Sequence, residues 1–124
     1  MCYVFVFSEL HYLPQTAYIN ETTYLLCGYA ETAITPVDWF YYNPAQYNSD
    51  EIFIIDGGYV VLDTVFNNRL NISGSTLIIN DVKPDDTGLY LCHENAGFGE
   101  EHGVNITVKG KLIERKVGAT SRTG

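Results

Sequence analysis

The side chains that could take part in chemistry are three cysteines and a short stretch rich in histidine and glutamate. The cysteines are Cys2, Cys27 and Cys92; none belongs to a C-x-x-C pair or to a Cys/His cluster with zinc-ligand spacing. Their odd number allows at most one disulfide within the chain and leaves one thiol over. The sequence contains no G-x-S-x-G nucleophile motif and no phosphate-binding glycine loop. It therefore predicts neither an enzyme nor a cofactor.

The histidine- and glutamate-rich stretch lies near the last predicted hairpin. It contains His93, Glu94, Glu100, Glu101 and His102. Imidazole and carboxylate groups bind divalent cations. Acidic side chains in loops are, however, usually just solvated. We therefore expect no metal site.

Three N-x-S/T sequons offer a different modification, N-linked glycosylation. The acceptor residues are Asn20, Asn71 and Asn105. One sequon alone is weak evidence. Three of them, in a short chain that can also form a disulfide, favour an extracellular protein, either at the cell surface or secreted.

Short β-rich runs separated by Gly, Pro, Asn and Asp must position all of these side chains. Helical periodicity is nearly absent, and such runs are typical of an all-β sandwich or barrel. Eight or nine strands are expected, with 3–7 and 16–19 as two pieces of one edge that Pro14 interrupts. The other predicted strands are 22–30, 37–42, 51–55, 59–65, 69–73, 75–80, 88–94 and 103–109.

Alternation along these strands separates a core face from an outer face. In the strand 37–42, the core face holds Val37, Trp39 and Tyr41, and the outer face holds Asp38, Phe40 and Tyr42. Around a tight hairpin at Gly74, the inward residues are Leu70, Ile72, Leu77 and Ile79.

The composition predicts one domain followed by a basic tail. The chain has 124 residues, of which 46% are hydrophobic, enough for a sizeable core. Residues 1–108 carry a net charge of −12, with Arg69 and Lys83 as their basic residues, whereas residues 109–124 carry +4. An acidic body argues against nucleic-acid binding. We expect a domain over residues 1–110 and a flexible linker-like tail over residues 111–124.

No apolar run approaches the roughly 20 residues that span a bilayer. The apolar start, MCYVFVFSEL, lacks the basic n-region of a signal peptide and is predicted to be a strand. Any membrane attachment is therefore expected through segments outside this sequence.

One constellation of residues resembles the immunoglobulin superfamily. The stretch DDTGLYLC, residues 85–92, matches the family's D-x-G-x-Y-x-C motif, and Trp39 follows Cys27 by twelve residues. The resemblance covers nearly all of residues 3–109. It implies an immunoglobulin-like, two-sheet Greek-key sandwich in which Cys27 and Cys92 form a disulfide between the sheets.

The same resemblance implies structural roles for the residues around that disulfide. Trp39 is expected to pack on the sulfurs, and Tyr90 to form a corner at the turn into the penultimate strand. Gly88 suits the tight turn before that strand. In variable-type domains the motif's aspartate, here Asp86, pairs with an arginine at the start of a hairpin strand, and Arg69 matches that position.

The spacing between the two motif cysteines favours the variable (V-set) pattern. Sixty-five residues separate them, and EIFIIDGGYVVLDTV leaves room for two strands beyond the seven of constant-type domains. The intermediate (I-set) pattern is the alternative, because the last hairpin loop resembles the N-x-x-G loop of adhesion-type domains. Phe98-Gly99 half-matches the F-G-x-G of antigen receptors, whose second glycine is replaced here by Glu101.

In V-set domains the sheet of strands G, F, C and C′ is the usual pairing face. Its outward residues in this sequence are Phe40, Tyr42, Leu91 and His93, with Phe98 at the adjoining loop. Such a face is more apolar than a solvated sheet needs. The resemblance therefore implies an extracellular recognition domain of an immune-type receptor or adhesion protein, binding a protein ligand or forming a homodimer. A glycan on Asn105 would reduce the area of this face that a partner can contact.

The alternative is a secreted, soluble pattern-recognition or decoy protein. It would bind its ligand through the end loops 30–36, 56–59 and 94–102.

Overall fold

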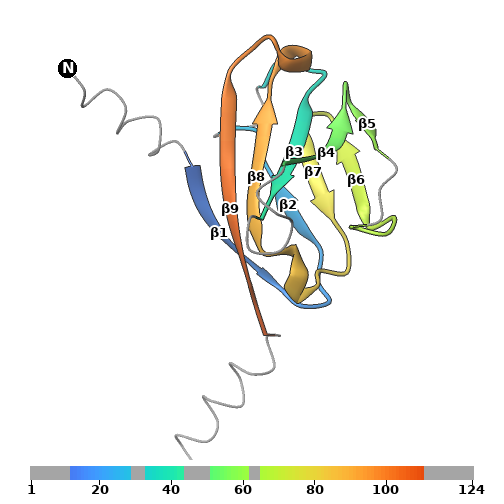
Figure 1. The fold of residues 1–124 in the computed structure, drawn as a ribbon, viewed down its shortest axis with the longest axis vertical. Coiled ribbons are helices and arrows are strands. Elements are labelled where there is room, and N and C mark those ends of the chain that lie inside the picture. The colour runs from blue at the N-terminus through green and yellow to red at the C-terminus, as the bar shows by residue number, and fades with distance from the viewer. Residues whose placement is uncertain (1–11, 29–32, 44–50, 62–64, 111–124) are drawn as a thin grey trace, which may run out of the picture.

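The computed structural model describes residues 12–28, 33–43, 51–61 and 65–110, which form two β-sheets packed face to face (Figure 1). The described strands are β1 (Tyr12–Tyr18), β2 (Thr23–Leu25), β3 (Asp38–Tyr42), β4 (Glu51–Asp56), β5 (Tyr59–Val60), β6 (Leu70–Ser73), β7 (Thr76–Ile79), β8 (Gly88–His93) and β9 (Glu101–Lys109). Two short 3-10 helices, η1 (Pro84–Asp86) and η2 (Asn95–Gly97), lie before and after β8.

The larger sheet has six strands in the order β1-β9-β8-β3-β4-β5, and the smaller has three in the order β2-β7-β6. β1 runs parallel to β9 along one edge, and the other pairs are antiparallel (Figure 1). The crossing of the chain between the sheets confirms the predicted all-β Greek-key sandwich.

The core fills the space between the two sheets. Its largest fully buried side chains include Trp39, Tyr41 and Tyr90 from the larger sheet and Leu77 and Ile79 from the smaller one. Cys27 and Cys92 form a disulfide across this core, with 5.6 Å between their Cα atoms. Both thiols are therefore withdrawn from redox and metal chemistry, and the disulfide ties the two sheets together.

A dense corner joins the sheets below β8. Arg69 and Asp86 form two hydrogen bonds of 2.6 and 2.8 Å, and the Asp86 carboxylate also accepts one from the backbone of Lys83. The hydroxyl of Tyr90 donates to the carbonyl of Asp86 at 2.5 Å. Gly88 has a φ of 153°, and a Cβ there would lie 2.7 Å from the Tyr41 ring. The corner therefore needs a glycine for close packing as well as for its backbone angle.

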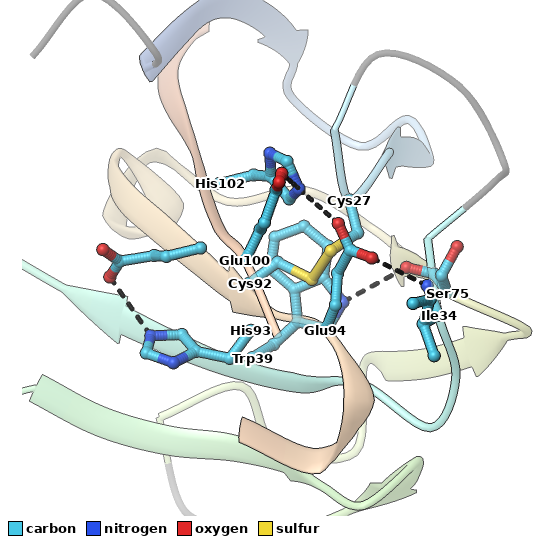
Figure 2. The surroundings of a disulfide bond; sticks show 10 residues. Cys27, Ile34, Trp39, Ser75, Cys92, His93, Glu94, Glu100 and His102 are labelled. Carbon is cyan, nitrogen blue, oxygen red and sulfur yellow. Dashed lines mark hydrogen bonds and ion pairs between the residues drawn. A yellow bond between two sulfur atoms is a disulfide. The ribbon is translucent and has the colours of Figure 1, made fainter. Parts of the chain in front are cut away.

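The hydrogen bonds that Arg69 donates to Asp86, together with the negative charge of that carboxylate, raise the pKa of Arg69. Trp39 lies in the core beside the disulfide, and its Nε1 donates to the carbonyl of Ser75, in the β6–β7 turn of the facing sheet, at 3.4 Å (Figure 2). The Arg69–Asp86 pair and the indole N–H of Trp39 thus all have hydrogen-bond partners, as polar groups in a stable interior require.

Several element boundaries differ from the sequence-based expectation. Pro14 does not interrupt the edge, because it lies within β1 opposite Asn105, and an edge strand tolerates a residue without an N–H. β2 is shorter than the predicted run 22–30, and β5 covers the first two residues of 59–65. The predicted strand 3–7, Cys2 and the tail 111–124 lie outside the described residues.

Within the described ranges, no helix has the length and apolar character needed to cross a membrane.

Candidate functional site

An aromatic row crosses the outer face of the six-stranded sheet. Phe53 on β4 stacks on Phe40 of β3, with 4.6 Å between ring centroids and 6° between planes. Phe40 also meets the ring of His93 on β8 edge-on, at 5.3 Å. We call Phe53, Phe40 and His93 the aromatic row. Phe40 and His93 are half-buried and Phe53 is 37% exposed, so the row is open to solvent at the centre of this face.

A β-bulge positions Phe53 in this row. β3 pairs with β4 through Trp39–Ile55 and then Phe40–Phe53, so one extra residue, Ile54, is accommodated on β4. Ile54 and Ile55 are consequently both buried, and Phe53 projects to the outer face. The sequence alone left the register of this strand open, since four consecutive apolar residues carry no alternation.

Polar groups border the aromatic row. The Nε2 of His93 lies 3.1 Å from a carboxylate oxygen of Glu101 on β9. Tyr42 is half-buried and lies two residues after Phe40 on the same face, and Glu51, its partner on β4, is exposed. The face thus has an apolar centre and a polar, mostly acidic border, which is the usual anatomy of a protein interface.

Leu91 does not belong to the exposed part of this face, contrary to the sequence-based expectation. It points away from the core but is only 4% exposed. Its neighbour across the ladder is Gly103, and the Tyr12 ring occupies the space where a side chain at position 103 would lie. Tyr12 and Phe40, on either side, leave Leu91 little contact with water. In the sequence, Gly103 was the one sign that a ring would pack over this position.

Asp38 is also buried, at 9% exposure, although alternation placed it on the outer face. Its carboxylate accepts a hydrogen bond of 2.7 Å from the backbone of Gly57 and lies close to Gly97. It thereby links β3 to the β4–β5 turn and to the β8–β9 loop.

Backbone hydrogen bonds tie the β8–β9 loop to the segment before β3. Asn95 and Ala96 donate to the carbonyls of Ile34 and Pro36, both at 2.7 Å. Large apolar side chains on these connected loops are exposed: Ile34 (59%) and Phe98 (88%). Tyr59, the first residue of β5, is 79% exposed. Phe98 therefore projects at the end of the sandwich, beyond the aromatic row.

A second histidine–glutamate pair lies beside the disulfide (Figure 2). His102, opposite Cys92 in the ladder, places its Nε2 2.6 Å from one oxygen of Glu94. The other oxygen of Glu94 accepts the backbone N–H of Ile34 at 2.9 Å. These hydrogen bonds, that of Ile34 first, lower the pKa of Glu94. Glu94 thus holds the β8–β9 hairpin against the segment before β3.

Glu94, Glu100 and His102 are the described residues whose donor atoms could converge on a divalent cation, within 4.8 Å of one another. Both oxygens of Glu94 already have protein partners, and Glu100 is largely exposed. Glu94 thus already serves to attach the β8–β9 loop.

The three sequons lie at exposed positions on different elements. Asn20 is in the turn after β1 with a φ of 68°, and Asn71 is on β6 of the smaller sheet. Asn105 is on β9, opposite Leu89, on the same sheet as the aromatic row.

The sequence model of the immunoglobulin V-set domain matches residues 13–109. The crystal structure of the N-terminal eight Ig domains of Down Syndrome Cell Adhesion Molecule, isoform 1.30.30, is similar, with 27% identity and a TM-score of 0.55. That match covers 82% of this chain but 12% of the adhesion molecule's chain.

A second similar structure is that of the ZIG-8 IG1 homodimer, with a TM-score of 0.56 over 81% of each chain. Its 14% identity supports the fold alone. A search of curated protein sequences finds no match. The family match extends over most of the chain and includes both cysteines of the disulfide, and it favours the V-set over the I-set pattern. The chain belongs to the immunoglobulin V-set domain family.

Proposed function

We propose that this chain is the extracellular recognition domain of a cell-surface receptor or adhesion protein, and that it pairs with a second copy of itself through the aromatic row. The proposed contact residues are Phe40, Phe53, Tyr42 and His93, and no catalysis is involved. The observation that carries the proposal is the solvent-open Phe53–Phe40–His93 row at the centre of the larger sheet.

The chemistry of this face supports pairing. Stacked aromatic rings provide large apolar area at a low entropic cost, and such groups are enriched at interface centres. A symmetric dimer would bring the row of one copy against the row of the other. The family match and the similar adhesion-molecule structure agree with this class of function, since V-set domains are usually extracellular, non-catalytic recognition modules.

Analytical ultracentrifugation of three proteins tests the proposal. The wild type should form dimers, and Phe40→Asp should be monomeric because it places a charge in the apolar contact. Tyr24→Asp is the matched control: it adds the same charge at an aromatic residue 59% exposed on β2, in the other sheet. It should dimerise like the wild type.

Thermal unfolding of each variant separates a lost contact from a lost fold. A folded Phe40→Asp that dimerises as well as the wild type would contradict the use of this face. A wild type that remains monomeric at all concentrations would contradict self-pairing.

One observation favours a second candidate, a secreted soluble protein that binds ligand through its end loops. Ile34 and Phe98 on the loops, and Tyr59 at the start of β5, are exposed near contacts made by Asp38 and Glu94. If Phe98→Ala weakens dimerisation no more than Tyr24→Asp does, Phe98 lies outside the dimer contact and is available to such a ligand.

A further inference from the structure

The outer face of the smaller sheet carries a short row with an unusual composition. Tyr24 on β2, Ile78 on β7 and Asn71 on β6 are consecutive partners across the three strands. Their neighbours along the strands, including Thr23, Leu25, Leu77, Ile79 and Leu70, are buried, so these three side chains point outward. An exposed tyrosine and a half-buried isoleucine therefore lie beside the acceptor of a sequon.

We propose that Asn71 carries an N-linked glycan whose first sugars lie across Ile78 and pack on the ring of Tyr24. The glycan shields this apolar row and stabilises the domain. The inference rests on the extracellular location proposed above, but not on the dimer contact, which is on the other sheet.

The modification requires a lipid-linked oligosaccharide as donor. A bond forms between Asn71 Nδ2 and the anomeric carbon of the first sugar, and the bond from that carbon to the lipid pyrophosphate breaks. The lipid pyrophosphate and the amide proton leave. Asn71 meets the local requirements, because Ile72 and Ser73 complete the sequon and the residue is exposed.

The hydrogen bond that holds the Asn71 side chain uses its oxygen and not the nitrogen that would carry the glycan. The Asn71 Oδ1 accepts the backbone N–H of Ile72 at 2.8 Å. The backbone of Tyr24 is two strand spacings from that of Asn71, about 9.5 Å, which the two N-acetylglucosamine units of an N-glycan core can bridge. The apolar C–H face of a sugar ring packs on an aromatic face, and doing so would remove exposed apolar area from water.

Secretion of the full chain from glycosylating cells, with peptide mass spectrometry and thermal unfolding, tests the proposal. Asn71 should be occupied. Ser73→Ala, which removes the sequon and leaves Asn71 in place, should lower the Tm by on the order of 4 °C. In a Tyr24→Thr background the same Ser73→Ala change should lower the Tm by less than half as much, because the ring that the sugar covers is gone.

The matched control is the same set of variants refolded from cells that do not glycosylate. There Ser73→Ala should leave the Tm unchanged, since Ser73 is exposed and no glycan is lost. An unoccupied Asn71 in the secreted chain would overturn the proposal, and so would an equal loss of Tm with and without Tyr24. Neither result would bear on dimerisation through Phe40.

Discussion

At the residue scale, the buried Arg69–Asp86 ion pair joins the corner to the hairpin β6–β7. Asp86 is 2% exposed and Arg69 is 14% exposed, so both charges are largely removed from water. The two parallel hydrogen bonds form the bidentate geometry in which arginine–carboxylate pairs are strong. Loss of either partner would leave the other charge buried without compensation.

We therefore expect Asp86→Asn to destabilise the domain by about 3–5 kcal/mol. The substitution keeps the shape of the side chain and removes its charge, so the loss reflects the unpaired guanidinium. Urea denaturation measures it. Asp85→Asn is the control, because Asp85 is the adjacent residue of η1 and is exposed, and it should change stability by less than about 0.5 kcal/mol. Similar losses in both variants would show that the ion pair is not the cause.

At the element scale, the packing of β1 on β9 decides how much of the larger sheet is available to a partner. β1 contributes Tyr12, whose ring lies over Gly103 and beside Leu91. The exposed apolar area of the outer face is therefore concentrated toward β3 and β4. This arrangement needs a residue without a side chain at position 103.

Gly103→Ala should consequently destabilise the domain by about 1–3 kcal/mol, since its methyl group would overlap the Tyr12 ring. Tyr12→Ala should remove most of this penalty when the two changes are combined, because the space is then free. Denaturant unfolding of the four proteins in this double-mutant cycle gives the coupling energy. Additive losses would mean that the ring and position 103 do not compete for the same space.

Local patterns predicted the strands well because alternation and turn residues are properties of a short stretch. The order Cys27, Trp39, Cys92 and the motif ending at Cys92 were sufficient to predict the two-sheet sandwich. Side-chain exposure on the outer face was less predictable. Leu91 is covered by Tyr12, which is 79 positions away in the sequence, and Asp38 is buried by the β4–β5 turn, whose Gly57 amide donates to its carboxylate. Such contacts depend on which strands become neighbours, which no single strand pattern contains.

The register of β4 was unpredictable for the same reason, because it depends on how β4 pairs with its neighbour β3. Ile52, Phe53, Ile54 and Ile55 form a continuous apolar run, so the choice of outward residue depended on the bulge opposite Trp39 and Phe40. The aromatic row was thus foreseeable at Phe40 and His93, but not at Phe53.

At the scale of the whole molecule, charge opposes the pairing that the aromatic row favours. Residues 1–108 carry −12, and the basic residues among them are already engaged: Arg69 with Asp86, and Lys83 with Asp81. Two such bodies repel each other over the Debye length, which shrinks from about 30 Å at 0.01 M salt to about 10 Å at 0.1 M. The basic residues after position 108 carry +4 and reduce the total to −8.

Dimerisation through an apolar face should therefore tighten as salt is raised from about 0.01 M to about 0.1 M, because screening weakens the repulsion. Sedimentation equilibrium at the two salt concentrations measures this change in Kd. A chain ending at residue 110 carries −11, so its dimer should be weaker than that of the full chain at low salt, and the two should converge at high salt. Weaker dimerisation of the full chain at high salt would instead indicate that attraction between the basic tail and the acidic body of a second copy, rather than the aromatic row, holds the pair together.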